Sequence, residues 1–133
     1  MTPDGDSRDR LTALRNGLLR LHSALLASER SQYERDIERI PSQGRFLELL
    51  LNDPAFTWLR ELSQLVVFID ERLEAEDPPD RAEADRLVAR ARQMLTPGQT
   101  GTAFETRYLE ALQRDPNVVM AHSTALTLLR GLG

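Results

Sequence analysis

Leucines recur at alternating spacings of three and four residues through the N-terminal third of this 133-residue chain. The seam they form, typical of a helix in a bundle or coiled coil, comprises Leu11, Leu14, Leu18, Leu21 and Leu25, and it continues through Tyr33, Ile37 and Ile40. Asp6 and Ser7 are suitable N-cap residues, so we expect the helix to begin near Arg8. Pro41 disfavours helical geometry at the residue before it, so the helix should end near Ile40. A helix of that length, on the order of 50 Å, can be buried only against partners of comparable length.

The densest apolar run lies between Asp53 and Asp70 and contains the only tryptophan. Wound as a helix, it places one set of side chains on a single face: Trp58, Leu59, Leu62, Leu65, Val66, Ile69 and Leu73. Phe56, Val67 and Phe68 fall outside this face. A helix that is apolar on more than one side is either central in its own fold or shared with a second subunit. We therefore predict a homodimer whose interface includes these three residues.

Capping residues and prolines divide the rest of the chain into further helices. Ser42 caps a segment over residues 43–52, and Asp53-Pro54 then restarts a helix that continues to about Ala75. The pattern leaves open whether Asp53-Pro54, and its later counterpart Asp115-Pro116, are kinks or full breaks. Asp80 and Thr102 each precede an acid by three positions, the capping-box pattern of a helix start. The later helices are expected at about 80–95, 102–114 and 116–130, with loops at 76–79 and 96–101.

Two segments of the chain are similar in sequence, which suggests a pseudo-repeat of two helical hairpins. The alternative is a chance match between leucine-rich helices. Residues 46–54 align without gaps on residues 108–116, and both segments end in Asp-Pro. The simplest assembly is a single all-α domain over residues 1–133. It is an up-and-down four-helix bundle whose second and fourth arms are kinked or broken at Asp-Pro. Residues 1–6 are expected to form a disordered tail.

Composition excludes several classes of protein. Without Cys, the chain has neither disulfides nor Cys-ligated zinc. The N-terminus lacks the pattern of a secretory signal, and no run approaches the roughly 20 apolar residues of a membrane span. A net charge of −4 argues against a nucleic-acid binder, because phosphate contacts need clustered positive charge. We expect a soluble cytoplasmic protein with no membrane or nucleic-acid partner.

Negative charge concentrates between Asp70 and Asp85, where eight acidic residues accompany two arginines. A solvated helix end and loop is one interpretation of this segment, and an acidic docking surface is the other.

Polar residues on otherwise apolar faces are the candidates for a binding site: Arg15, His22, Glu29 and Tyr33 on the first helix and His122 on the last. First and last helices are commonly neighbours in an up-and-down bundle, so these side chains can meet. One interpretation is a core site for a ligand or metal, built from two imidazoles and a carboxylate. The other is a buried polar network in which Arg15 or another arginine neutralises Glu29 and the imidazoles find backbone or side-chain partners.

Sequence marks of catalysis are missing. The chain has no Glu-x-x-His, His-x-x-x-His or Gly-x-Ser-x-Gly pattern and no glycine-rich phosphate loop. Ala121-His122-Ser123 is superficially similar to the phosphorylated site of histidine phosphotransfer domains, but the chain contains no Lys and His122 faces inward. We therefore predict a protein that is not an enzyme, with no catalytic residues, no metal and no cofactor.

Two patterns resemble an all-helical family of uncharacterised bacterial proteins: Leu21-His22-x-x-Leu25-Leu26-x-x-Glu29-Arg30-x-x-Tyr33-Glu34, and Asp53-Pro54-x-Phe56-x-Trp58-Leu59-Arg60-x-Leu62-Ser63 followed by Ile69-Asp70-Glu71. The resemblance covers the first half of the chain well and the rest loosely. It implies a bacterial, cytoplasmic, helical protein and brings no activity with it. It draws attention to His22, Glu29, Tyr33 and Trp58 as a group.

We therefore expect a cytoplasmic interaction or regulatory protein that acts as a homodimer. The alternative is a helical bundle that binds a small ligand or a metal near His22 and His122.

Overall fold

The computed structural model describes residues 3–96, 98 and 101–133, with side chains from residue 6 onward. Over these residues the chain is helical and contains no strand, which confirms the expected all-α class. The helices are α1 (Pro3–Asp36), α2 (Gln43–Asn52), α3 (Pro54–Thr57), α4 (Arg60–Glu74), α5 (Arg81–Leu95), α6 (Ala103–Arg114) and α7 (Pro116–Leu132). None of them combines the length and apolar character needed to cross a membrane. The loop expected at 96–101 includes residues 97, 99 and 100, which lie outside the described residues.

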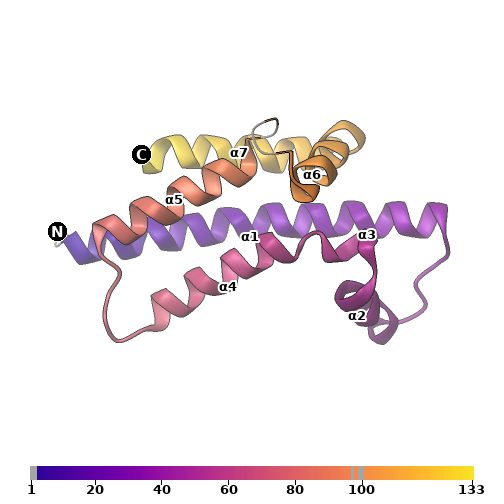
Figure 1. Ribbon diagram of the computed structural model, residues 1–133, viewed down its shortest axis with the longest axis horizontal. Coiled ribbons are helices and arrows are strands. Elements are labelled where there is room, and N and C mark those ends of the chain that lie inside the picture. Colours follow the sequence, from indigo (N-terminus) through magenta and orange to yellow (C-terminus); the bar gives the residue numbers. More distant parts are fainter. Residues whose placement is uncertain (1–2, 97, 99–100) are drawn as a thin grey trace.

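Helix α1 is the axis of the molecule, and most other helices pack along it (Figure 1). It contacts α3, α4, α5, α6 and α7, so the first and last helices are neighbours, as expected. In Figure 1, α4 lies on one side of α1, and α5 and α7 lie on the other. The four longer helices α1, α4, α5 and α7 run in alternating directions. Helix α2 packs mainly against α3 and stands apart from this group.

The leucine seam of α1 forms the centre of the main core. Its members, Leu11, Leu14, Leu18, Leu21 and Leu25, are each at most 1% exposed. They belong to one cluster with buried side chains of α4, α5, α6 and α7. Because full burial of a leucine side chain contributes about 1.5–3 kcal/mol, this seam is a major source of stability.

The ends of α1 differ from expectation. The helix includes residues 3–6 of the expected tail, whereas residues 1 and 2 lie outside the described residues, and it ends at Asp36 rather than near Ile40. Beyond its end, the Glu34 carboxylate accepts a hydrogen bond from the backbone N–H of Ile40 (3.1 Å), which holds the chain in a turn. Ile37 is consequently 64% exposed and is not part of the seam, whereas Ile40 is buried in a second core cluster.

This second cluster lies where the long helix ends, and it consists of Tyr33, Ile40, Phe46, Leu49 and Phe56. Phe56 is 2% exposed, and its ring centroid lies 5.6 Å from the rings of both Tyr33 and Phe46. The prediction that Phe56 lies at an interface is therefore wrong. Helix α3 has only four residues, so Phe56 does not share the helical phase of α4 and its ring turns inward.

The helix expected from Pro54 to Ala75 is interrupted at Trp58 and Leu59, between α3 and α4. The backbone N–H of Leu59 donates to the carbonyl of Phe56 (3.0 Å), which is the tighter turn of a 3₁₀ helix. The indole N–H of Trp58 donates to the carbonyl of Ala55 (3.0 Å) and secures this turn. The arm therefore changes direction one turn after Asp53-Pro54.

Asp53 and Asp115 are full breaks, since each is a single non-helical residue between two helices. In both, the backbone N–H donates to the carbonyl four residues earlier (2.9 and 3.0 Å), and the carboxylate accepts from the N–H two residues later (2.9 Å in each). This shared geometry agrees with the similarity between residues 46–54 and 108–116. The similarity does not extend past the Asp-Pro pairs, because α3 has 4 residues and α7 has 17. The predicted caps Ser42, Asp80 and Thr102 also accept hydrogen bonds from the backbone three residues later.

Candidate functional site

The outer face of α4 is the candidate interaction surface. The inner face of this helix is buried through Leu62, Leu65, Val66 and Ile69. On the other side, Val67 and Phe68 are 53% and 46% exposed, and they line a shallow hollow of about 300 Å³. We define the outer α4 face as all the exposed residues of this helix: Arg60, Gln64, Val67, Phe68, Glu71 and Glu74. The structure thus places two of the three predicted interface residues in solvent.

Charge on the outer α4 face is divided between its two ends. Arg60 lies at the start of the helix and donates one hydrogen bond to the carbonyl of Leu51 (3.1 Å). Glu71 and Glu74 lie near its end and make no ion pair or hydrogen bond with the residues that the structure describes. A carboxylate near the C-terminus of a helix meets the negative end of the helix dipole. Two acids therefore occupy an unfavourable position without compensation from this protomer.

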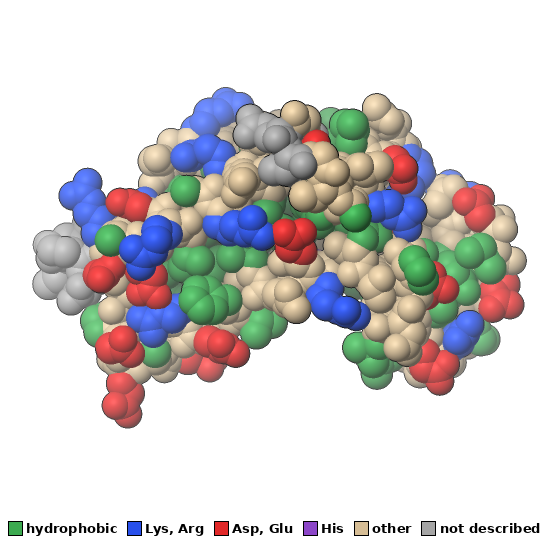
Figure 2. Space-filling view, in the orientation of Figure 1, with side chains coloured by type: hydrophobic (Ala, Val, Ile, Leu, Met, Phe, Trp, Pro, Cys, Tyr) green, Lys and Arg blue, Asp and Glu red, His purple; other side chains and the backbone are tan. Residues whose placement is uncertain are grey.

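The rest of the acidic segment is largely paired within the chain. The pairs are Arg15 with Asp70 (2.8 Å), Arg72 with both Glu83 and Asp77 (3.4 Å to the latter), and Arg10 with Asp85 (2.8 Å). Figure 2 shows acidic side chains at the end of the molecule where α4 leads into α5. Since four of the eight carboxylates in this segment have an arginine partner, the segment is not one continuous acidic surface, and Glu71 and Glu74 are among the acids left over.

Glu29 is a buried charge that pairs with the end of α6. Only 7% of its side chain is exposed, and Arg114 Nη2 donates to Glu29 Oε1 (2.8 Å) and to Ser28 Oγ (2.9 Å). Glu29 and Arg114 line a hollow of about 270 Å³, separate from the one on α4. Tyr33, one turn later on α1, lines it too, and its ring packs against Phe56. This arrangement agrees with the polar-network interpretation, since an arginine neutralises Glu29. The arginine is Arg114 rather than Arg15, which pairs with Asp70.

His122 takes part in a row of aromatic rings that begins at Trp58. The ring centroid of Phe104 lies 5.5 Å from Trp58 and 5.7 Å from Tyr108, and Tyr108 lies 5.4 Å from His122. The Tyr108 hydroxyl and His122 Nδ1 are 2.5 Å apart. Burial raises the pKa of Tyr108 and lowers the pKa of His122, so a protonated hydroxyl faces a neutral imidazole, and the tautomer of His122 sets which of the two groups donates. Sequence reasoning did not select Tyr108, although its inward position on the helix after Thr102 was a usable signal.

His22 lies outside this aromatic row. It is half-buried, burial lowers its pKa, and it makes no hydrogen bond or ion pair with the residues that the structure describes. Three of the other predicted ligand-binding residues bond to different partners: Arg15 to Asp70, Glu29 to Arg114 and His122 to Tyr108. They therefore do not form one common site. Within the described residues, no group of three or more His, Cys, Asp or Glu side chains is placed to hold a metal ion.

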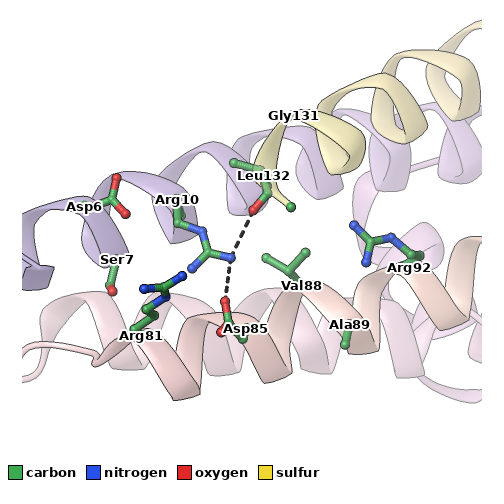
Figure 3. A pocket seen from close by; sticks show the side chains of 11 residues that line it. Asp6, Ser7, Arg10, Arg81, Asp85, Val88, Ala89, Arg92, Gly131 and Leu132 are labelled. Carbon is green, nitrogen blue, oxygen red and sulfur yellow. Dashed lines mark hydrogen bonds and ion pairs between the residues drawn. The ribbon is translucent and has the colours of Figure 1, made fainter.

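A cleft of about 880 Å³ lies between the start of α1, α5 and the end of α7, and three arginines line it (Figure 3). Arg10 donates to the carbonyl of Leu132 (3.0 Å), and Arg92 donates to the carbonyl of Leu129 (3.1 Å). The last carbonyls of a helix have no partner within it, so these guanidinium groups satisfy the end of α7. Two of the three arginines of this cleft, Arg10 and Arg92, are therefore engaged in holding α7 against α1 and α5.

Comparison with known proteins adds no relative from which a role can be transferred. No protein-family model, no curated protein and no solved structure matches this chain. The functional conclusion therefore rests on the geometry of the outer α4 face.

Proposed function

We propose that this chain is a non-enzymatic interaction protein of the bacterial cytoplasm that acts as a homodimer. Its frame is an up-and-down four-helix bundle of α1, α4, α5 and α7, whose alternating directions in Figure 1 support this arrangement. One observation carries the proposal: Val67 and Phe68 are half-exposed in the middle of a helix whose opposite face is buried in the core. A second protomer on the outer α4 face removes both side chains from water.

The remaining exposure sets the strength of such a dimer. Full burial of a Val or Phe side chain contributes about 1.5–3 kcal/mol relative to full exposure. About half of Val67 and Phe68 is still exposed, so covering each contributes about 1 kcal/mol, or about 4 kcal/mol over both protomers. Association also costs translational and rotational freedom, so these side chains alone cannot hold a dimer at micromolar concentration. We therefore expect a weak, reversible dimer to which the rest of the outer α4 face also contributes.

The alternative function, binding of a small ligand or a metal in the core, has less support. It requires His22 and His122 to face a common site with Arg15 and Glu29 nearby. His122 is instead bonded to the hydroxyl of Tyr108, and the two charged residues have partners on other helices.

Sedimentation equilibrium from micromolar to about millimolar concentration tests the homodimer. The wild type is expected to show a monomer–dimer equilibrium, and Phe68→Asp is expected to remain monomeric, because it places a carboxylate from each protomer in the apolar centre of the interface. Leu47→Asp is the matched control: it introduces the same charge at a leucine of α2 that is 57% exposed, and it should leave the dimer intact. Circular dichroism should show unchanged helix content in both variants. A wild type that is monomeric at every concentration, or a Phe68→Asp dimer as stable as the wild type, would refute the proposal.

A further inference from the structure

We infer that two copies of this chain associate with their α4 helices antiparallel, so that each Arg60 lies opposite Glu71 and Glu74 of the other protomer. This inference rests on the proposed homodimer and adds its orientation and the residues that determine it. The observation behind it is the order of the outer α4 face: a base, then polar and apolar residues, then two acids.

The outer α4 face is complementary to itself when a second copy is reversed. Val67 is the midpoint of α4, which runs from Arg60 to Glu74. A two-fold axis through Val67 pairs the same patch on both protomers, as a closed dimer requires. It brings the apolar centres together and sets the positive start of each helix against the negative end of the other. Antiparallel helices also align their dipoles favourably.

The unpaired charges of the protomer agree with this orientation. Glu71 and Glu74 lack partners among the described residues and sit at the negative end of the α4 dipole. Arg60 uses one donor on the carbonyl of Leu51, and a guanidinium group carries five N–H donors. It can therefore keep that contact and still bind a carboxylate of a second protomer. Dimerisation places one arginine, Arg60 of the other protomer, beside these two acids, for which their own chain provides no cation.

A parallel arrangement has the opposite electrostatics. It places Arg60 against Arg60 and the acidic ends against each other, and like charges at close range destabilise a pair of helices. The self-complementary order of charges is also the reason for choosing a second copy of this chain as the occupant, since a different protein would not require such symmetry within one helix. The 15 residues of α4 span about 22 Å, so the contact is small and the dimer reversible.

Charge substitutions test the orientation in the full-length chain by sedimentation equilibrium. Arg60→Glu should weaken the dimer about tenfold or more, because two symmetry-related contacts change from attraction to repulsion. Adding Glu71→Arg and Glu74→Arg to that variant should restore association, because the charge order is inverted but still complementary. Arg60→Ala shows whether Arg60 attracts or repels the second protomer. A weaker dimer supports the antiparallel arrangement, whereas a tighter one shows a parallel arrangement and overturns the inference.

Cysteine cross-linking gives an independent readout, since the natural chain contains no Cys. Val67→Cys lies on the proposed axis, so oxidation should join two protomers. Glu74→Cys should remain unlinked, because the two copies of this position lie at opposite ends of the helix pair. A dimer in which Glu74→Cys links readily, or which Arg60→Glu leaves unchanged, overturns the orientation while the homodimer stands. A wild type that never dimerises refutes the proposed function itself.

Discussion

The buried ion pair between Glu29 and Arg114 is expected to couple α1 to α6. Side-chain exposure is 7% for Glu29 and 24% for Arg114, and the two groups are 2.8 Å apart. Breaking a fully buried pair costs about 3–5 kcal/mol, and breaking an exposed pair costs about 0–1 kcal/mol. This pair lies between these limits, so we expect Glu29→Ala to lower the free energy of unfolding by about 2–3 kcal/mol. Arg114→Ala should cost a similar amount, because it leaves a carboxylate buried without a cation.

A double-mutant cycle measures this coupling. The double variant Glu29→Ala/Arg114→Ala should cost clearly less than the sum of the single variants, because no unpaired charge is left behind. Urea unfolding followed by tryptophan fluorescence is a suitable assay, since the only tryptophan, Trp58, is half-buried and lies 5.5 Å from the ring of Phe104. Circular dichroism of the same samples checks that unfolding is a single transition.

An exposed ion pair provides the control for the cycle. Arg45 and Glu48 on α2 are 3.2 Å apart, and 42% and 68% of their side chains are exposed. Solvent screens such a pair, so their substitution by alanine should show little coupling. A Glu29–Arg114 coupling no larger than that of this control would refute the reasoning, because it would mean that burial does not strengthen the contact. It would also reopen Glu29 as a candidate ligand-binding residue.

Phe56→Ala is expected to lower the free energy of unfolding by about 3–5 kcal/mol in the same urea assay, because its ring fills the second core cluster; a loss below about 1 kcal/mol would contradict that packing. Stability is also expected to depend on pH. Burial lowers the pKa of His22 and of His122, so below about pH 6.5 the unfolded chain binds more protons than the folded one. The contribution of the two histidines to the free energy of unfolding is therefore complete above about pH 6.5, and it is lost as the pH falls towards their pKa values in the folded chain. Urea unfolding across this range should show the loss, and His22→Gln/His122→Gln should flatten it; a profile that the double substitution leaves unchanged would contradict the assignment.

Much of the helical structure was predictable because its causes lie within a few residues of one another. The spacing of Leu11 to Leu25 places these side chains on one face of any helix they form, and all of them are buried. The caps at Asp80 and Thr102 bond to backbone groups three residues later, which is a property of the local chain. Periodicity and capping therefore determined the all-α class and most helix boundaries.

Only the tertiary structure decided which side chains meet and which remain in water. The partner of Glu29 lies 85 residues away in sequence, and no local pattern distinguishes Arg114 from the other arginines. The break after α3 turns Phe56 into the core, while Val67 and Phe68 stay exposed although all three are equally apolar in the sequence. Such outcomes depend on the distances and rotations between helices, which the order of residues within one helix does not encode. The sequence by itself therefore determined the helices and their apolar faces, and the packing of helices decided the surface on which the proposed function rests.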